Sequence, residues 1–409
     1  MTDVWLECTN CSATFDLREP KFFGCPKCST NNKRWPVEVM YDYEAIARRM
    51  GRIPYIEARA SLWRFSDLLP VRDLKNVVTL DEGGTPLTRI DVSKVPLYVK
   101  NETLNPTWSF KDRFNTVNIS MARDLGYNKV VSLTSGNAGA AVAAYTSAAG
   151  MRSLVICENE VPPHLVHAIQ VYGGDVVKVE KLGAQELVVQ LVREYGWFPS
   201  IQSPVSDVGV PYGVEGYKTI GYEIALQCKD HQPDYIFGPI GSGDGLYGMY
   251  KGFKEFVRLG IVNKLPGFCG CQICGADPVV QAYIKGELEQ RMIKPFPTKA
   301  ISIAASISGD HCLAAIYDSG GLAIDVTEEE AFDAVREVAR KGILLELSSA
   351  TSIAGALKAV NKDLLAPESK IVCLVTSAGI KWPEILSTMV PDPPFISSDI
   401  GKLKSVVSL

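Results

Sequence analysis

Short runs rich in β-branched and aromatic residues alternate with helical stretches from residue 97 onward, and this alternation constrains the fold most strongly. Such alternation is typical of parallel sheets that helices cover on both faces. We therefore predict an α/β protein whose ligands bind at the carboxyl ends of the strands. The predicted strands are residues 97–99, 130–133, 153–157, 176–179, 235–237, 271–275 and 371–375.

Lys111 lies just past a turn-like stretch, Asn105-Pro106-Thr107, and begins a predicted helix. The positive end of the helix dipole disfavours a protonated amine at that position. An amine that is readily neutral can attack an aldehyde and form an imine. Lys111 is therefore a candidate nucleophile, although a lysine at a helix start is more often solvated when no other motif accompanies it.

The predicted strand at 130–133 passes through a tight turn of small residues into an alanine-rich helix. Turns of this kind aim free backbone N–H groups at a ligand. Asn137 lies in this turn, and it could either contact a ligand or cap the following helix.

A second turn, residues 238–246, contains four glycines and Ser242 and leads into another helix. Glycines let the backbone close on a phosphate at a helix N-terminus. The loop lacks the terminal Gly-Lys-Ser/Thr of a nucleotide-binding P-loop. The alternative is a packing turn without a ligand, but such a turn does not need the side-chain donor of Ser242.

A reactive lysine, a turn carrying Asn137 and a cradle for one phosphate together indicate a phosphorylated aldehyde held as a Schiff base. Pyridoxal phosphate has this chemistry.

The chain resembles the fold-type II pyridoxal-phosphate enzymes and, within that group, is similar to the threonine synthases along nearly its whole length. The resemblance implies a tryptophan synthase β-like fold with two parallel-sheet α/β domains and the cofactor between them. It places a large domain at 36–102 and 212–409 and a small domain at 103–211. The matching stretches are residues 82–87, 105–113, 135–139, 215–219, 238–246 and 376–381.

The resemblance also implies roles for individual residues. Lys111 bonds the cofactor and later moves the substrate α-proton, and Asn137 bonds the 3′-oxygen of the cofactor. Thr376 meets the pyridine nitrogen through its hydroxyl, although that hydroxyl could instead bond the backbone at the end of a buried strand. The cofactor phosphate is held by Gly241, Ser242, Gly243, Asp244 and Gly245, and the substrate carboxylate by Thr134, Ser135, Gly136 and Asn137.

The substrate implied by the resemblance is O-phosphohomoserine, which is converted with water to threonine and phosphate. Two departures from the family pattern concern this substrate. Trp108 stands where the family usually has glycine, at the mouth of the site, and residues 210–213 replace an Asn-Pro-x-Arg run that helps to hold the substrate phosphate. Arg113 and Lys218 are candidate replacements for the missing arginine, although such residues are more often solvated or ion-paired.

These departures keep other functions open. The alternative enzyme performs β-elimination or β-replacement on a serine-type substrate, as a Ser/Thr ammonia-lyase or a cysteate or cysteine synthase-like enzyme does. A non-enzymatic alternative is a zinc-ribbon binding module on an inactive body, which the presence of Lys111, Asn137, the glycine loop and Thr376 disfavours.

The N-terminus contains Cys8-x2-Cys11, thirteen intervening residues and Cys25-x2-Cys28. Two such thiolate pairs can surround one tetrahedral Zn²⁺, with a short hairpin joining them. We predict a structural zinc ribbon at residues 1–35, as many threonine synthases have, and the alternative is a set of four reduced thiols. A second group, Cys269, Cys271 and Cys274, alternates in a way that favours a buried strand over a metal site.

Composition excludes some partners. The net charge is −4 and the basic residues are dispersed, so nucleic acid is not an expected partner. The sequence contains no apolar run of about 18 residues and no signal peptide, so we expect neither a membrane span nor secretion. The odd number of cysteines, eleven, suits a reducing cytoplasm. The family resemblance further implies a homodimer acting on a small amino-acid substrate.

Overall fold

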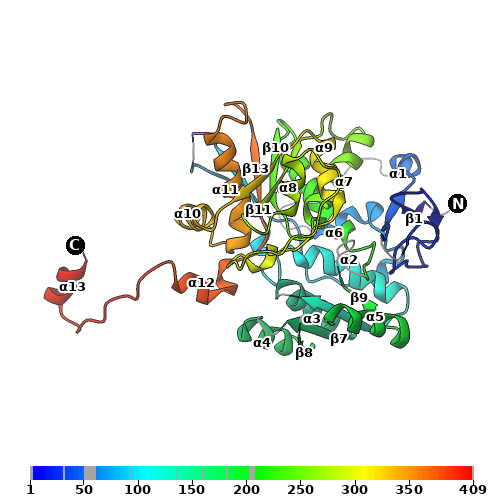
Figure 1. Cartoon of the computed structure of the whole chain (residues 1–409), viewed down its shortest axis with the longest axis horizontal. Helices are drawn as coiled ribbons and strands as arrows, with labels where there is room; N and C mark the ends of the chain where they lie inside the picture. Colours follow the sequence, from blue (N-terminus) through cyan, green and yellow to red (C-terminus); the bar gives the residue numbers. More distant parts are fainter. Residues whose placement is uncertain are drawn as a thin grey trace.

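The computed structural model describes residues 3–30, 33–49, 61–92, 94–134, 136–158, 161–180, 183–201 and 208–407 of the 409-residue chain. These residues form three sheets with surrounding helices (Figure 1). No helix within these ranges is long and apolar enough to cross a membrane.

The N-terminal sheet is antiparallel, in the order β2-β1-β3. Residues of β1 and β3 alternate between buried and half-buried positions, as expected for strands with one face against a core. Because β3 lies beyond residue 35, this sheet extends past the predicted end of the ribbon. The strands are β1 (Val4–Cys8), β2 (Thr14–Phe15) and β3 (Val37–Tyr41), and α1 (Tyr43–Arg49) follows.

The largest sheet has six strands in the order β12-β11-β10-β13-β5-β4. All neighbouring pairs are parallel except the edge pair β4–β5. Every residue of β11 and β13 is buried, so both faces of the sheet are covered. The strands are β4 (Leu87–Ile90), β5 (Leu97–Asn101), β10 (Tyr235–Pro239), β11 (Gly267–Ile273), β12 (Ala323–Val326) and β13 (Ile371–Val375).

The third sheet has four parallel strands in the order β8-β7-β6-β9 and lies below the large sheet in Figure 1. The α/β prediction is therefore confirmed. Each of the seven predicted strands overlaps an observed one, but the strand predicted at 271–275 begins at Gly267 and ends at Ile273. The strands are β6 (Lys129–Thr134), β7 (Arg152–Glu158), β8 (Asp175–Val179) and β9 (Phe198–Pro199), and the helices on this sheet are α3 (Asn137–Ala148), α4 (Pro163–Val171) and α5 (Ala184–Tyr195).

Close helix contacts position the predicted site. A Cβ atom at Gly216 in α6 would lie 1.8 Å from the backbone oxygen of Arg113 in α2, and one at Gly252 in α7 would lie 2.3 Å from that of Lys218. These glycines let α6 lie against both helices that begin at predicted cofactor-binding residues. The remaining helices are α2 (Lys111–Asp124), α6 (Val214–Gln227), α7 (Asp244–Arg258), α8 (Pro278–Ile284), α9 (Asp310–Asp318), α10 (Glu328–Ala339), α11 (Leu347–Asn361), α12 (Pro383–Ser387) and α13 (Ile400–Val406).

Five short 3₁₀ helices complete the described structure: η1 (Leu62–Leu68), η2 (Leu74–Asn76), η3 (Glu102–Leu104), η4 (Ile301–Ile303) and η5 (Gly379–Lys381). Past α12 the chain runs away from the body and ends in α13 (Figure 1). Cys269 and Cys271 are buried in β11, as the strand interpretation predicted, and the exposed Cys274 follows that strand.

Candidate active site

Lys111 is the first residue of α2, as predicted. Its side chain is partly exposed, and its amine lies 4.9 Å from the ring centre of Phe110 and 5.7 Å from that of Tyr217. Desolvation lowers the pKa of Lys111 to about 8, although the carboxylates of Asp244 and Glu346 oppose this shift. A substantial fraction of this amine is therefore neutral, and nucleophilic, near physiological pH.

The lowered pKa predicts how the cofactor-free protein attaches an aldehyde. We expect the rate of cofactor attachment to rise with pH and to level off above about pH 8, because the neutral fraction of Lys111 saturates there rather than near the ordinary value of 10.5. The growth of visible absorption after pyridoxal phosphate is mixed with cofactor-free protein at a series of pH values measures this rate. A rate that still climbs steeply above about pH 9 would contradict the lowered pKa.

Phe110, the residue before Lys111, links this helix to two other predicted motifs. Its backbone N–H donates to the backbone oxygen of Thr376 at 2.8 Å. A Cβ atom at Gly245 would lie 2.7 Å from its ring, so the glycine loop packs directly against it. Lys111, the end of β13 and the start of α7 therefore meet at one place.

Asn137 joins the same place from the small sheet. It is the first residue of α3 and does not cap that helix, because Gly136, with φ of 142°, occupies the cap position. The amide nitrogen of Asn137 donates to Glu346 at 2.7 Å, and its amide oxygen accepts a hydrogen bond from Ser377 Oγ at 3.3 Å. The two sheets thus present their polar side chains to each other at the carboxyl ends of β6 and β13.

The turn after β6 is shaped by its own side chains. Thr134 Oγ1 accepts hydrogen bonds from the N–H groups of Gly136 at 3.0 Å and Gly139 at 3.1 Å. Thr134 therefore stabilises the start of α3. Ser135, which was predicted to bind the substrate carboxylate, lies outside the described residues.

The glycine loop follows β10 and ends at the first residue of α7, Asp244. Gly243 has φ of 98°, which favours glycine, and an added Cβ there would lie 2.6 Å from Cys312 Sγ. The first N–H groups of a helix have no partner within it, so those of α7 can bind an anion. The buried Asp244 carboxylate lies 3.3 Å from His311 Nε2.

Thr376 directly follows β13, and its buried hydroxyl lies 2.7 Å from the hydroxyl of Ser349 in α11. The described bond is therefore to a side chain and not to the backbone, contrary to the alternative considered for this residue. Together, the nucleophilic amine, the helix-start amides and the strand-end hydroxyl fit the aldehyde, phosphate and ring nitrogen of pyridoxal phosphate.

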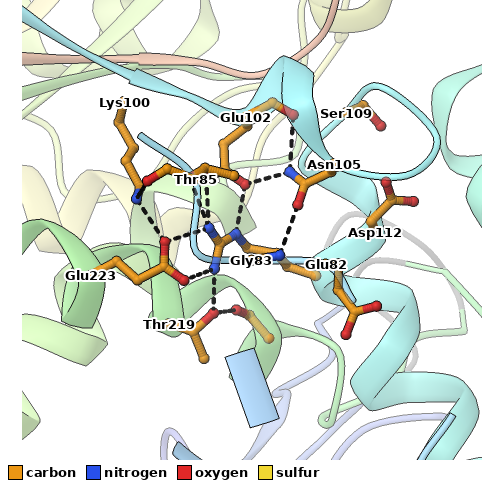
Figure 2. Close-up of polar contacts among 12 residues, drawn as sticks. Glu82, Gly83, Thr85, Lys100, Glu102, Asn105, Ser109, Asp112, Thr219 and Glu223 are labelled. Atoms are coloured by element: carbon orange, nitrogen blue, oxygen red, sulfur yellow. Dashed lines mark hydrogen bonds and ion pairs between the residues drawn. The ribbon is translucent and has the colours of Figure 1, made fainter. Parts of the chain in front are cut away.

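Arg113 does not lie where a substrate could reach it, which corrects its prediction as a substrate-binding residue. Its side chain is fully buried, and its guanidinium donates to Glu102 Oε2 at 2.6 Å and to Glu223 Oε1 at 2.7 Å (Figure 2). Thr85 and Thr219 accept further hydrogen bonds from it. The guanidinium group has five N–H donors, and these partners accept from all three of its nitrogen atoms, so no donor remains for a substrate.

Lys218 requires the same correction. Its fully buried amine lies 2.6 Å from Glu215 Oε2 and 3.1 Å from Glu255 Oε1. It also lies 4.0 Å from the ring centre of Tyr41 in the N-terminal sheet. Sequence spacing alone could not show that these two cations meet carboxylates from distant parts of the chain.

Trp108 is half-exposed, with 51% of its surface accessible, and its φ is 60°, in the left-handed region. The turn around it is held by Asp112, which accepts hydrogen bonds from Thr107 N at 2.7 Å and Thr107 Oγ1 at 2.6 Å. The position therefore has a backbone conformation that glycine adopts most easily.

The other departure, residues 210–213, lies inside the protein. Tyr212 is fully buried, and its hydroxyl donates to Leu17 O at 2.6 Å. A Cβ at Gly213 would lie 2.2 Å from Phe114. This stretch joins the N-terminal region to α2 through packing.

Sequence reasoning missed several polar residues of the site. Glu346 is nearly fully buried and directly precedes α11, and its carboxylate accepts a hydrogen bond from Asn137 and interacts with Lys111. Ser302, Ser349 and Ser377 contact Asn137 or Thr376. The available signal was weak, because an acidic residue before a helix rich in small residues is also an ordinary helix start.

The four N-terminal cysteines form the group of described residues suited to a metal ion. Their sulfur atoms all lie within 4.8 Å of one another. The Cys8 and Cys28 sulfurs are 3.4 Å apart, and those of Cys11 and Cys25 are 3.8 Å apart. Four thiols gathered in this way fit a tetrahedral zinc site.

Comparison with known proteins agrees with this site. A family model described as "Pyridoxal-phosphate dependent enzyme" matches residues 78–377. The chain is 34% identical over 414 residues to a threonine synthase of Methanocaldococcus jannaschii, covering 98% of each chain, and 33% identical over 341 residues to one of Mycobacterium tuberculosis, covering 81% of this chain and 91% of that one. Among solved structures, a processed threonine deaminase isoform from Solanum lycopersicum matches with a TM-score of 0.63 at 20% identity, covering 83% of this chain and 97% of that chain.

Proposed function

The chain belongs to the family of pyridoxal-phosphate-dependent enzymes, and from this premise we propose that it is a threonine synthase. The proposed reaction converts O-phosphohomoserine and water to threonine and phosphate. The observation that carries the proposal is the 34% identity to a threonine synthase over 98% of both chains, which includes the cysteine-rich N-terminus.

In the proposed site, Lys111 would bond the aldehyde carbon of the cofactor, and Asn137 would donate to its 3′-oxygen. Residues 241–245 hold its phosphate, and the Thr376 hydroxyl meets its ring nitrogen. When bound, the cofactor withdraws electrons from the substrate α-carbon and so makes proton removal there possible.

The residues of the chain supply the proton transfers. With substrate bound, the Lys111 amine would take the α-proton and return protons to the substrate carbon atoms. Its pKa of about 8 suits both directions of transfer, because a general base works best near the operating pH. The turn from Thr134 to Asn137 binds the substrate carboxylate through its helix-start N–H groups.

A product assay tests the proposal. The holoenzyme is incubated with O-phosphohomoserine or with O-phosphoserine, and phosphate, 2-oxo acid and amino-acid products are measured. We expect threonine and phosphate in equal amounts from O-phosphohomoserine and little product from O-phosphoserine. Release of a 2-oxo acid or of a new amino acid from O-phosphoserine, without threonine from the other substrate, would contradict the proposal.

The alternative function, β-elimination or β-replacement on a serine-type substrate, is favoured by one specific observation. Arg113 and Lys218 are both enclosed in ion pairs, so neither replaces the arginine that is missing from residues 210–213. A shorter substrate would not need this contact.

Trp108 offers a test of the substrate-side geometry. Replacing Trp108 with glycine is expected to stabilise the protein by about 1 kcal/mol, because glycine relieves the left-handed backbone. We also expect kcat/KM for O-phosphohomoserine to rise by about tenfold as the indole no longer narrows the mouth of the site.

Thermal unfolding and steady-state kinetics measure the two effects of Trp108→Gly. Asp363→Gly is a matched control, because Asp363 also has a left-handed backbone, with φ of 52°, in the loop after α11. The control should change stability alone. A fall in kcat/KM for Trp108→Gly would show instead that the indole contacts the substrate productively.

We further propose that Cys8, Cys11, Cys25 and Cys28 bind a structural zinc ion. Purified protein is expected to contain about one zinc per chain, and Cys11→Ser is expected to lose it, because one of four ligands is removed. Elemental analysis checks this. Cys274→Ser removes another exposed cysteine and should retain the metal. Equal zinc content in both variants would overturn the assignment.

We propose a cytoplasmic homodimer, with a ribbon at 1–35, a large domain at 36–102 and 212–409, and a small domain at 103–211. The two parallel sheets, whose carboxyl ends meet at Asn137 and Ser377, support the position of the cofactor between domains. A cofactor site between two domains can close when substrate binds.

A further inference from the structure

The Ser349 hydroxyl is surrounded by polar atoms at the end of β13. It accepts hydrogen bonds from Ser377 N at 2.9 Å and Thr376 N at 3.2 Å. It also lies 2.7 Å from Thr376 Oγ1 and 3.3 Å from the Ser377 carbonyl oxygen. A serine hydroxyl has one proton and two lone pairs. The two backbone N–H groups occupy both lone pairs, so the proton of Ser349 must be donated.

The better acceptor for that proton is Thr376 Oγ1, because it is the nearer of the two oxygens. Thr376 then accepts from Ser349 and keeps its own proton for a different partner. Ser349 is the described hydrogen-bond partner of the Thr376 hydroxyl, and the Thr376 side chain is only 6% exposed. Among the described residues, the Thr376 proton therefore has no acceptor, and a ligand that enters the site can accept it.

We propose that Ser349 is a positioning residue that directs the Thr376 proton toward the ring nitrogen of the cofactor. The inference rests on the proposed contact between Thr376 and that nitrogen. Because Thr376 is held as a donor, the nitrogen must accept, which disfavours its protonated form.

This arrangement has a chemical consequence. An unprotonated ring nitrogen withdraws fewer electrons from the substrate, so amino-group transfer to the cofactor is suppressed relative to elimination and replacement. Without Ser349, the Thr376 hydroxyl can rotate and accept a hydrogen bond from a protonated nitrogen. Ser349 would thus control the type of reaction without touching the substrate.

Ser352 provides a matched control. It lies one turn further along α11 and is fully buried, and its hydroxyl lies 2.9 Å from the backbone oxygen of Ser349 and 2.8 Å from that of Leu374, which share its one proton. It does not contact the Thr376 hydroxyl. Ser352→Ala therefore removes a buried serine hydroxyl from the same helix without changing the donor direction of Thr376.

The experiment compares wild type, Ser349→Ala and Ser352→Ala with cofactor alone and then with L-alanine. We expect Ser349→Ala to raise the dissociation constant of pyridoxal phosphate by about threefold to tenfold, as loss of one oriented hydrogen bond predicts. Its visible absorption band should also shift and titrate at a different pH. With L-alanine, which has no leaving group, pyruvate should form faster, since the amino group moves to the cofactor as the alanine α-carbon is oxidised.

Ser352→Ala should match wild type in all three measurements. Identical spectra, titration and pyruvate formation in wild type and Ser349→Ala would overturn the proposal, even if Ser349→Ala melts at a lower temperature. None of these measurements uses O-phosphohomoserine, so a failure of the threonine synthase assay is distinguishable from a failure here.

The single variant Thr376→Val, which keeps Ser349, covers the case in which Ser349→Ala folds poorly. Thr376→Val removes the hydroxyl that Ser349 orients, and it should reproduce the spectral shift with Ser349 present. Adding Ser349→Ala to Thr376→Val should then change the spectrum no further, because both residues act through one proton. If the spectral changes of the two substitutions added, the two residues would not act through one proton, and the proposal would be wrong.

Discussion

Replacing Lys111 with alanine is expected to lower the rate of product formation by at least about a thousandfold, since the protein loses both its covalent hold on the cofactor and its proton carrier. The partly exposed amine, with its pKa lowered to about 8, is the described group that combines nucleophilicity with a place between the glycine loop and Asn137. Phosphate and threonine formation from O-phosphohomoserine measure the loss.

Lys381→Ala is a suitable comparison for Lys111→Ala. Lys381 is a second lysine near the site, but it is buried, and its amine donates to Thr107 O at 3.0 Å and so stabilises the turn before α2. We expect Lys381→Ala to retain the cofactor's visible absorption, which Lys111→Ala should lose. Activity of Lys111→Ala within tenfold of wild type would contradict the assigned role.

The second large effect concerns stability. Replacing Arg113 with alanine is expected to destabilise the protein by about 3–5 kcal/mol, because the carboxylates of Glu102 and Glu223 remain buried without their shared cation (Figure 2). Lys100, at 2.6 Å from Glu223, compensates only one of them. The urea midpoint of the cofactor-free protein, followed by circular dichroism, measures the change.

The same ion pairs predict how the stability of the protein depends on pH. Burial alone would raise the pKa of Glu223, but Arg113 and Lys100 outweigh it and hold that pKa well below its ordinary value. A carboxyl with a lowered folded-state pKa contributes stability above its unfolded-state pKa and loses it as the pH falls through the folded-state value. In Arg113→Ala the folded-state pKa of Glu223 rises toward or above its unfolded-state value, so the variant should lose less of its remaining stability than wild type does as the pH falls from neutral into the acid range.

Arg113→Lys separates charge from geometry. Lysine keeps the positive charge but not the planar donors that bridge two carboxylates, so we expect an intermediate loss of stability. If Arg113→Ala changed the midpoint no more than an exposed substitution such as Arg336→Ala does, the buried cluster would not stabilise the fold.

The fold could be predicted from the sequence where its strands are long and apolar. A strand such as β13, which is buried on both faces, forms a continuous apolar run that local sequence reveals. In the two α/β sheets the missed strands are short or at edges: β9 has two residues, and β4 is an antiparallel edge strand. Such strands are defined mainly by their partners.

The same distinction between local sequence and tertiary packing applies to the candidate site. Lys111, Asn137 and Thr376 were predictable because each directly follows or begins an element, where backbone geometry alone sets the position of the side chain. The surroundings of Arg113 were not, since its partners Glu102 and Glu223 are 11 and 110 residues away in sequence. Local patterns fix where a side chain begins, and tertiary packing decides what it meets.

Borohydride reduction followed by peptide mapping tests the central claim most directly. Reduction fixes the bond between the cofactor and the amine that holds it, and digestion with mass spectrometry locates the label. The account predicts a single pyridoxyl label on the peptide that contains Lys111. A label on any other lysine, or no label in protein that is fully loaded with cofactor, would contradict it.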